Sequence, residues 1–232
     1  MKIIPIILCR GGSKSVPRKN IRDLAGKPLL SYALTEALKV FPKVYLSTED
    51  TEIAEVGVRF RATTLVRPQK YAQDESKSID TVKYHLRGLR ELEGDFEAIL
   101  LINACTPFCT STKIKEIVIM AEEIKDYDSI TTLVEDFSAH PSKTCNLIGN
   151  KIYPLSPSYD FKTGERQKLV PTYKRNTCLY LSKIKTIKNG SFFGKNNYGL
   201  VMNQEESLDI NSKFDFLIAE LYMKHINDKK EL

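Results

Sequence analysis

A loop close to the start of the chain carries most of the residue types that could handle phosphate groups. It contains Gly11, Gly12 and Ser13, and five basic side chains surround them: Arg10, Lys14, Arg18, Lys19 and Arg22. Because glycine has no Cβ, backbone N–H groups in such a loop can come close to a ligand. The serine hydroxyl and the basic side chains add donors and positive charge that suit several phosphate oxygens. The loop is therefore a candidate cradle for a triphosphate.

The spacing of this loop matches neither of two familiar phosphate-binding motifs. A Walker A loop needs GxxxxGK[ST] and a dinucleotide-binding turn needs GxGxxG, and the segment has neither. A basic surface turn with no ligand is the alternative interpretation, and both stay open on the loop alone.

The elements around the loop predict how it is held. The run Ile3–Leu8 is apolar and rich in β-branched residues, which predicts a buried central strand that leads into the loop. A second continuous apolar run, 98–102, predicts its neighbour in the sheet. Further strands are expected over 44–46, 62–66, 129–134 and 198–202, alternating with helices over 29–40, 51–56, 77–92, 111–126 and 213–226. This alternation predicts an α/β fold with a doubly wound, mainly parallel sheet, which binds ligands beyond the carboxyl ends of its strands.

The last predicted helix has four large apolar residues at helical spacing. They are Phe214, Leu217, Ile218 and Leu221, and they predict the apolar face of an amphipathic helix.

Length and composition favour one globular domain. The chain has 232 residues, of which 42% are hydrophobic and 28% charged, enough for one substantial core with an insertion. No run approaches the roughly 18 apolar residues of a membrane span, and the first strand begins at Ile3. We therefore expect no membrane segment, no signal peptide and a cytoplasmic location. Five cysteines without a CxxC pair favour reduced thiols over disulfides or a zinc site.

The charge balance favours small anionic substrates. The chain has 35 Lys and Arg against 29 Asp and Glu, a formal net charge of +6. Outside the first loop these residues are dispersed, and no nucleic-acid-binding module is visible, so nucleic acid is not expected as a partner.

The segment RGGSKSVPRKNIRDLAGKPLL, residues 10–30, closely resembles a known signature. It is similar to the N-terminus of the cytidylyltransferases that activate sialic acids and related sugar acids, the acylneuraminate cytidylyltransferases. There Arg-Gly-Gly-Ser-Lys-Gly-x-Pro-x-Lys-Asn and Gly-Lys-Pro-Leu recur in this order, although Ser15 stands where the family usually has glycine. The resemblance covers nearly the whole chain. It implies the nucleotide-diphospho-sugar transferase fold, a single domain over 1–232 and a small β-rich dimerisation lobe inserted at about 135–180, hence a homodimer.

The resemblance also implies a CTP site. The triphosphate would be held by Arg10, Gly11, Gly12, Ser13 and Lys14, with Lys19 at the reacting phosphate and Asn20 near the nucleotide. The segment VRPQKYAQDESKSIDTV resembles the family's next motif, which implies that Arg67 and Ser78 lie near the cytosine base. Without the resemblance, Arg67 and Pro68 would merely end a strand and Ser76 would cap a helix.

The same resemblance implies a site for the sugar acid. Asn103 stands where the family usually has glutamine, in a loop that lacks the family's trailing arginine. In the lobe, Lys143, Arg166 and Lys174 would face the sugar carboxylate or the phosphates, reaching across into a partner's site. Lys174 falls where arginine is more usual, and Thr177 where glycine is. A solvated basic lobe is the alternative.

The family places an Asp-x-Asp before its last helix to hold a divalent cation. This chain has Asp209-Ile210-Asn211, in which alternate residues face the same way. The resemblance therefore implies Mg²⁺, or Mn²⁺, on Asp209 and Asn211, with weaker binding because an amide replaces a carboxylate. Mg²⁺ is often held by one or two carboxylates plus phosphates and waters. The alternative is that Asn211 or Ser212 simply caps the helix.

The implied reaction is nucleotidyl transfer in the biosynthesis of cell-surface glycans. The anomeric hydroxyl of a 2-keto sugar acid, such as a sialic or legionaminic acid, attacks the α-phosphorus of CTP, releasing pyrophosphate and leaving a CMP-sugar. Arg10, Lys19 and Asp209 are the expected catalytic residues, because this chemistry requires positioning and neutralised phosphate charge. Two alternatives stay open: a related nucleotidyltransferase for another base or sugar, and a catalytically impaired paralogue that binds nucleotide and acts as a partner protein.

Overall fold

The structure, a computed structural model, describes residues 1–156 and 169–230. Within these ranges one seven-stranded sheet forms the centre of the molecule, in the order β11-β7-β10-β6-β1-β4-β5. The strands are β1 (Ile3–Leu8), β4 (Tyr45–Thr48), β5 (Thr63–Val66), β6 (Ala98–Ile102), β7 (Ser129–Glu135), β10 (Tyr173–Lys183) and β11 (Asn197–Met202). All neighbours are parallel except that β10 is antiparallel to both β6 and β7. The predicted mainly parallel sheet is confirmed, as is the pairing of the two apolar runs, β1 with β6.

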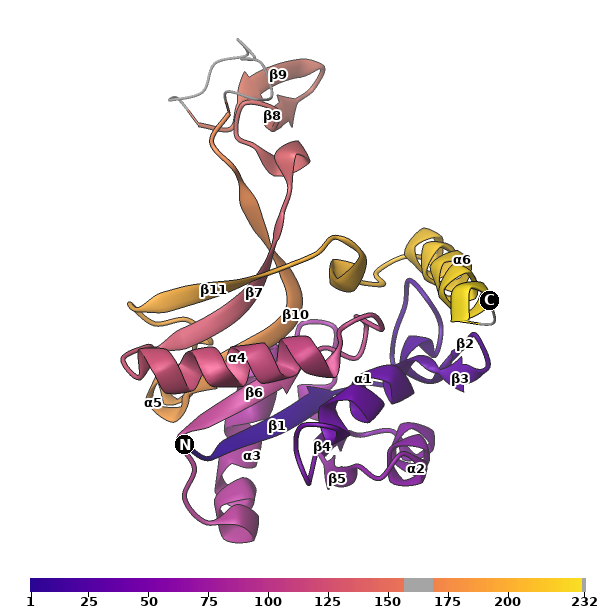
Figure 1. The fold of residues 1–232 in the computed structure, drawn as a ribbon, viewed down its shortest axis with the longest axis vertical. Coiled ribbons are helices and arrows are strands. Elements are labelled where there is room, and N and C mark those ends of the chain that lie inside the picture. The colour runs from indigo at the N-terminus through magenta and orange to yellow at the C-terminus, as the bar shows by residue number, and fades with distance from the viewer. Residues whose placement is uncertain (157–168, 231–232) are drawn as a thin grey trace.

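Helices cover both faces of this sheet, as the doubly wound prediction requires (Figure 1). One face packs against α1 (Leu29–Leu38), α2 (Thr51–Arg59) and α4 (Ser111–Ile124), and the other against α3 (Ser78–Glu93) and α5 (Ile184–Lys188). Strand β1 shows why: Ile7 contributes to the first core and Ile6 to the second, and both are fully buried. Burying such a side chain contributes about 1.5–3 kcal/mol, so a strand that is apolar on both faces requires cover on both.

A narrow lobe projects from the body between β7 and β10 (Figure 1). It contains the short helix η3 (Phe137–Ala139) and the antiparallel hairpin of β8 (Cys145–Ile148) and β9 (Lys151–Pro154). The returning strand β10 belongs to both parts. Its first residues pair with the end of β7, and 179–183 lie in the central sheet against β6. The predicted lobe therefore passes into the sheet before its expected end at 180.

The last helix, α6 (Lys213–Lys230), turns a different face inward from the one predicted. Its buried residues Phe216, Ala219 and Met223 pack with Val16, Leu24, Leu29, Phe108 and Ile210 against the first loop and the small hairpin of β2 (Asp23–Leu24) and β3 (Lys27–Pro28). The predicted apolar face is exposed instead, with Phe214 at 68% and Leu221 at 61%. The correction has a simple cause: this helix has apolar residues on two sides, and periodicity does not show which side finds a partner.

Candidate functional site

Three loops meet at the carboxyl ends of β1 and β6 and hold one another by hydrogen bonds. The Nζ atom of Lys19, after β1, donates to the carbonyl of Ile210 at 2.5 Å. The N–H of Ile210 donates to the carbonyl of Cys105, after β6, at 2.9 Å. Within the first loop, buried Asn20 donates from its amide to the carbonyl of Arg10 at 3.0 Å. Segments distant in sequence thus meet at the edge of the sheet where this type of fold binds its ligands.

A cavity of about 410 Å³ lies at this edge. Its lining contains seven of the residues predicted for the nucleotide: Arg10, Ser13, Lys14, Lys19, Asn20, Arg67 and Ser78. Ser15, at the position where the family usually has glycine, lines it too. Three cations from one loop in a cavity of this size suit a small polyanionic ligand.

Asp74 neutralises two of these cations, a role that the sequence did not indicate. Its carboxylate pairs with Arg10 at 3.0 Å and also with Lys14. The hydrogen bond from Lys14, with Arg10 beside it, holds the pKa of Asp74 below its ordinary value, so this carboxylate is ionised at neutral pH. Any phosphate that binds Arg10 and Lys14 therefore competes with Asp74.

Glu49 holds the first loop in place by hydrogen bonds, a role that its position between a strand and a helix did not indicate. One oxygen accepts the N–H of Gly11 at 2.7 Å, and the other accepts two contacts from the guanidinium of Arg67, both 3.0 Å. Glycine is also required at position 11 for steric reasons, because a Cβ there would lie 2.3 Å from Oδ2 of Asp50, the N-cap of α2. Glu49 links the loop to a residue predicted to contact the base.

A second cavity, of about 590 Å³, lies beside the first at the base of the lobe. Lys174, which the resemblance implies would reach into a partner's site, lines this cavity of its own chain instead, together with Arg175, Asn176, Thr177 and Asp209. Lys174 pairs with Asp136 at 2.7 Å, and that hydrogen bond, with one from Ser138, lowers the pKa of Asp136 well below its ordinary value. Asn211 lines both cavities, so the two share a boundary at this residue.

Asp209 and Asn211 lie side by side, as their alternate spacing predicted. The amide of Asn211 donates to Oδ2 of Asp209 at 2.9 Å, and the hydroxyl of Thr177 donates to the same oxygen at 2.7 Å. The other oxygen, Oδ1, is buried and has no hydrogen-bond partner among the described residues. A buried carboxylate oxygen without a donor suits a cation, so these residues fit a divalent metal ion. Over 1–156 and 169–230 no group of three or more His, Cys, Asp or Glu gathers as a closed metal site.

The segment caps the last helix, as the second interpretation of the sequence expected. Ser212 precedes α6, and its hydroxyl accepts the N–H of Asp215 at 3.1 Å, while Oδ2 of Asp215 accepts the N–H of Ser212 at 2.7 Å. This reciprocal pair is a capping box with aspartate in the second position. Burial raises the pKa of Asp215, but hydrogen bonds from Asn211 and Ser212 outweigh it and leave that pKa below its ordinary value. Capping by Ser212 leaves the side chain of Asp209 free for other contacts.

Of the other residues predicted for the sugar site, the two that the structure describes do not line the second cavity. Asn103 follows the end of β6, where its side-chain Oδ1 accepts the N–H of Cys105 at 3.0 Å and its side-chain amide donates to the hydroxyl of Thr177 at 3.4 Å. Lys143 is exposed on the projecting lobe. Arg166 lies outside the described residues.

Two titratable side chains near the nucleotide cavity are neutral. Burial raises the pKa of Cys105, which keeps its thiol protonated. Burial, and then the charge of Arg67, lower the pKa of His85 to about 4, and its ring shares a hydrogen bond of 2.8 Å with Ser47. Neither side chain therefore adds a charge beside the cavity at neutral pH.

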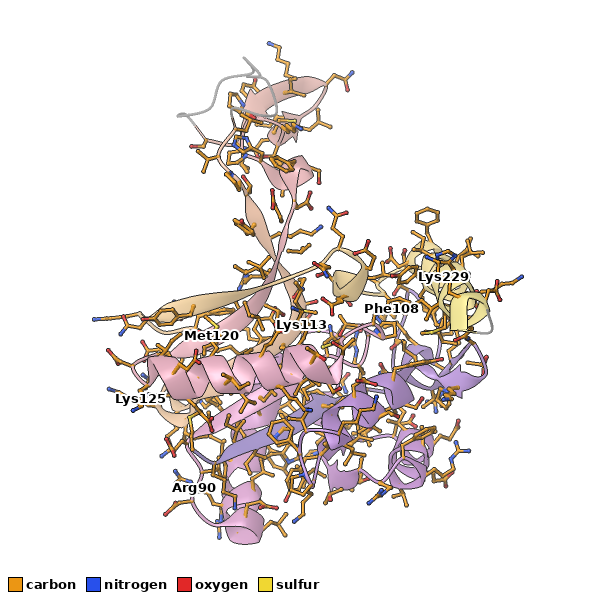
Figure 2. All side chains as sticks on the ribbon, viewed as in Figure 1. Arg90, Phe108, Lys113, Met120, Lys125 and Lys229 are labelled. Atoms are coloured by element: carbon orange, nitrogen blue, oxygen red, sulfur yellow. The ribbon has the colours of Figure 1, made fainter. Side chains whose placement is uncertain are left out.

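Side chains fill the space between the helices and the central sheet (Figure 2). Phe108, labelled beside α6, meets the ring of Tyr222 with centroids 4.9 Å apart. This contact packs the end of the loop after β6 against α6, so the helix supports the segment that carries Asp209 and Asn211. No helix in the described ranges is long and apolar enough to cross a membrane.

The architecture is that of the nucleotidyltransferase fold. A solved CMP:2-keto-3-deoxy-manno-octonic acid synthetase complexed with CTP superposes with a TM-score of 0.72 at 14% identity, covering 97% of this chain and 99% of that one. The 4-diphosphocytidyl-2C-methyl-D-erythritol synthase of Anaerococcus prevotii gives 0.63 at 11% identity, covering 96% and 98%. Residues 4–151 match the family model described as cytidylyltransferase. The chain belongs to the cytidylyltransferase family.

Two curated relatives match along nearly the whole chain. The CMP-N,N'-diacetyllegionaminic acid synthase of Legionella pneumophila is 31% identical, covering 97% of each chain. The N-acylneuraminate cytidylyltransferase of Escherichia coli is 28% identical over 99% of this chain, and the chain spans 54% of that relative's length.

Proposed function

We propose that this protein transfers a cytidylyl group from CTP to a 2-keto sugar acid of the sialic or legionaminic type, releasing pyrophosphate. The observation that carries this proposal is the boundary between the two cavities. One is lined by the basic loop and the other by Lys174, and Asn211 belongs to both. A nucleotide in the first and a sugar acid in the second would have their reacting groups side by side at Asp209 and Asn211. The printed functions of the Legionella pneumophila and Escherichia coli relatives support this reaction class.

Each group of residues has a role in this proposal. Arg10, Ser13 and Lys14 bind the phosphates in place of Asp74. Lys19 contacts the segment that carries Asp209 and Asn211 through its hydrogen bond to the carbonyl of Ile210. Arg67 and Ser78 line the part of the cavity proposed for the base. Asp209, with Asn211, would hold Mg²⁺, which supplies charge neutralisation on the phosphates when bound. The protein itself contributes positioning of the two substrates.

The reaction is tested by measuring pyrophosphate release with Mg²⁺ across the four nucleoside triphosphates and a panel of sialic, legionaminic, pseudaminic and 3-deoxy-octulosonic acids. Release with CTP and one sugar acid is expected, and it names the substrate. Release with a different nucleotide would assign another base. Silence across the panel from protein that a thermal shift shows to bind CTP would favour the impaired paralogue.

We further propose a homodimer formed through the lobe, working in the cytoplasm where CTP is made. The hairpin β8–β9 exposes Leu147, Ile148, Ile152 and Tyr153 to solvent, by 69%, 68%, 55% and 44%. A two-stranded hairpin is marginal alone, and contiguous exposed apolar side chains are typical of an interface. In this proposal Lys143 and Arg166 reach the partner's sugar site.

The shared site is tested by complementation. Lys14→Ala and Arg166→Ala should each be inactive alone and recover activity when mixed, because one of the two sites in a mixed dimer is then intact. No recovery in a mixed dimer verified by mass spectrometry would contradict cross-subunit sites.

A further inference from the structure

Three polar side chains lie in one connected cluster around Asp209. They are Asn103, Thr177 and Asn211. Asn103 donates to the hydroxyl of Thr177 at 3.4 Å, and that hydroxyl donates to Oδ2 of Asp209 at 2.7 Å. Asn211 donates to the same oxygen at 2.9 Å. Residues scattered along the sequence thus converge on a single carboxylate.

Thr177 has a backbone conformation that its side chain disfavours. Its φ angle is +59°, in the left-handed region, which a β-branched residue rarely adopts and which glycine adopts freely. It lies in an irregularity of β10, where the pairing with β7 shifts between Arg175 and Tyr180. Strained residues persist where the surrounding structure holds them, and they often mark a functional constraint.

The surrounding structure does hold this irregularity. Asn176 is 4% exposed, and its side-chain Oδ1 accepts the hydroxyl of Thr132 at 2.6 Å and the N–H of Cys178 at 3.2 Å. Its amide donates to the hydroxyl of Ser207 at 2.8 Å, two residues before Asp209. The same buried side chain therefore fixes both the turn that carries Thr177 and the segment that carries Asp209.

The consequence for Asp209 is an asymmetric carboxylate. Oδ2 accepts two neutral donors, whereas Oδ1 is buried with no hydrogen-bond partner in the described part of the chain. Groups that hydrogen-bond to a metal-binding carboxylate orient it and tune its affinity.

We propose that Thr177 is a positioning residue, whose hydroxyl orients Asp209 so that Oδ1 faces the divalent cation. The neutral donors of Thr177 and Asn211 hold Asp209 in this orientation by hydrogen bonds. A carboxylate at position 211 could not donate such a bond, so the cation itself would have to hold the two acidic side chains together. The inference rests on the proposed function, because it assumes that the cation binds at Asp209.

The test compares three variants that separate the hydroxyl from the strain. Thr177→Val keeps the β-branch and loses the hydroxyl, Thr177→Gly loses both, and Thr177→Ser keeps the hydroxyl without the second branch. The readout is the ratio of CTP affinity in Mg²⁺ to CTP affinity in EDTA, measured by isothermal titration calorimetry without a sugar acid. Because the ratio reports coupling between metal and nucleotide, a general loss of folded protein does not change it.

We expect the ratio to fall about tenfold in Thr177→Val and Thr177→Gly and to stay within about twofold of the parent in Thr177→Ser. The valine and glycine variants should change thermal stability in opposite directions, since only glycine relieves the φ strain, yet share the defect. Parent-like coupling in Thr177→Val overturns the inference, provided that Asp209→Asn loses coupling. Parent-like coupling in Asp209→Asn itself places the cation elsewhere, which overturns the metal assignment and this inference together.

Discussion

Replacing Glu49 with glutamine should destabilise the protein far more than its position in a loop would indicate. The side chains of Glu49 and Arg67 are only 9% and 4% exposed, and the pair shares two contacts of 3.0 Å. Glutamine keeps the shape and one oxygen, which can still accept the N–H of Gly11. It turns its other end, an amide, toward a buried guanidinium that then has no compensating charge.

The magnitude follows from that geometry. Removing one partner of a buried ion pair costs about 3–5 kcal/mol because the remaining charge stays desolvated. Since glutamine retains one hydrogen bond, we expect about 3 kcal/mol for Glu49→Gln. In a chain of this size, a loss of about 3 kcal/mol lowers the melting temperature by roughly 6–12 °C.

Urea unfolding at pH 7, followed by circular dichroism, measures the effect. The double variant Glu49→Gln with Arg67→Gln should lose less than Glu49→Gln alone, because it leaves no unpaired charge. Glu52→Gln is the matched control: Glu52 is 71% exposed and pairs with Arg18 at 2.9 Å, so its loss should change stability by less than about 0.5 kcal/mol. If the free energy of unfolding of Glu49→Gln lies within about 1 kcal/mol of the parent value, Glu49 and Arg67 do not stabilise the fold as a buried ion pair.

Three further predictions concern charges at or near the site. Asp74→Asn should raise the affinity for inorganic triphosphate about fivefold in calorimetry without metal, because the two cations that it pairs become available; unchanged or weaker binding would show that it does not compete. The pKa of His85 is about 4 in the folded chain, below the unfolded 6.5, so the unfolded state takes up the proton first as pH falls. Stability should therefore rise between about pH 4 and 6.5, by about 1–2 kcal/mol after discounting for solvent screening, and His85→Gln should flatten the rise in urea titrations; an unchanged slope would assign the dependence to other groups. Asn211→Asp should make turnover depend more steeply on Mg²⁺ and raise it several-fold, because two carboxylates side by side repel each other unless a cation binds them; unchanged turnover and Mg²⁺ dependence would show that the position tolerates an amide.

The Asp74 variant needs a control for net charge. Asp95→Asn removes the same charge from an exposed loop before β6, at the opposite end of the sheet. It should leave the affinity for triphosphate unchanged, and a similar gain there would assign the effect to the overall field.

The sequence predicted the centre of the sheet well because β1 and β6 are continuous, buried apolar runs. Ile3–Leu8 and 98–102 were placed correctly and paired correctly. The insertion of β10 between β6 and β7 was not predicted, because most of this strand falls within 135–180, where the composition indicates an inserted lobe. The short helix α5 and the hairpin β2–β3 are too brief to leave a periodic pattern.

For the site, residue type predicted the cations but not their partners. Arg10, Lys14 and Lys19 were candidates because phosphate chemistry needs donors and positive charge. Glu49 and Asp74 were missed because a carboxylate next to a helix start or in a polar loop has many ordinary roles. Only the fold brings Glu49 against the first loop, 38 positions away in the chain.

The antiparallel strand β10 has a consequence for the order in which the chain folds. Strands β5, β4, β1 and β6 all come from residues 3–102, so four of the seven strands can pair early from nearby segments. Strand β7 follows next in the chain but has no neighbour there, because β10 must first occupy the edge of β6. During synthesis, the apolar strand β6, which is fully buried in the folded chain, therefore keeps one edge unpaired until residue 183 has been made. Unpaired strand edges favour association between chains. We expect pulse-labelling hydrogen exchange to show β10 and β7 becoming protected together and after β1, and earlier protection of β7 would contradict this order.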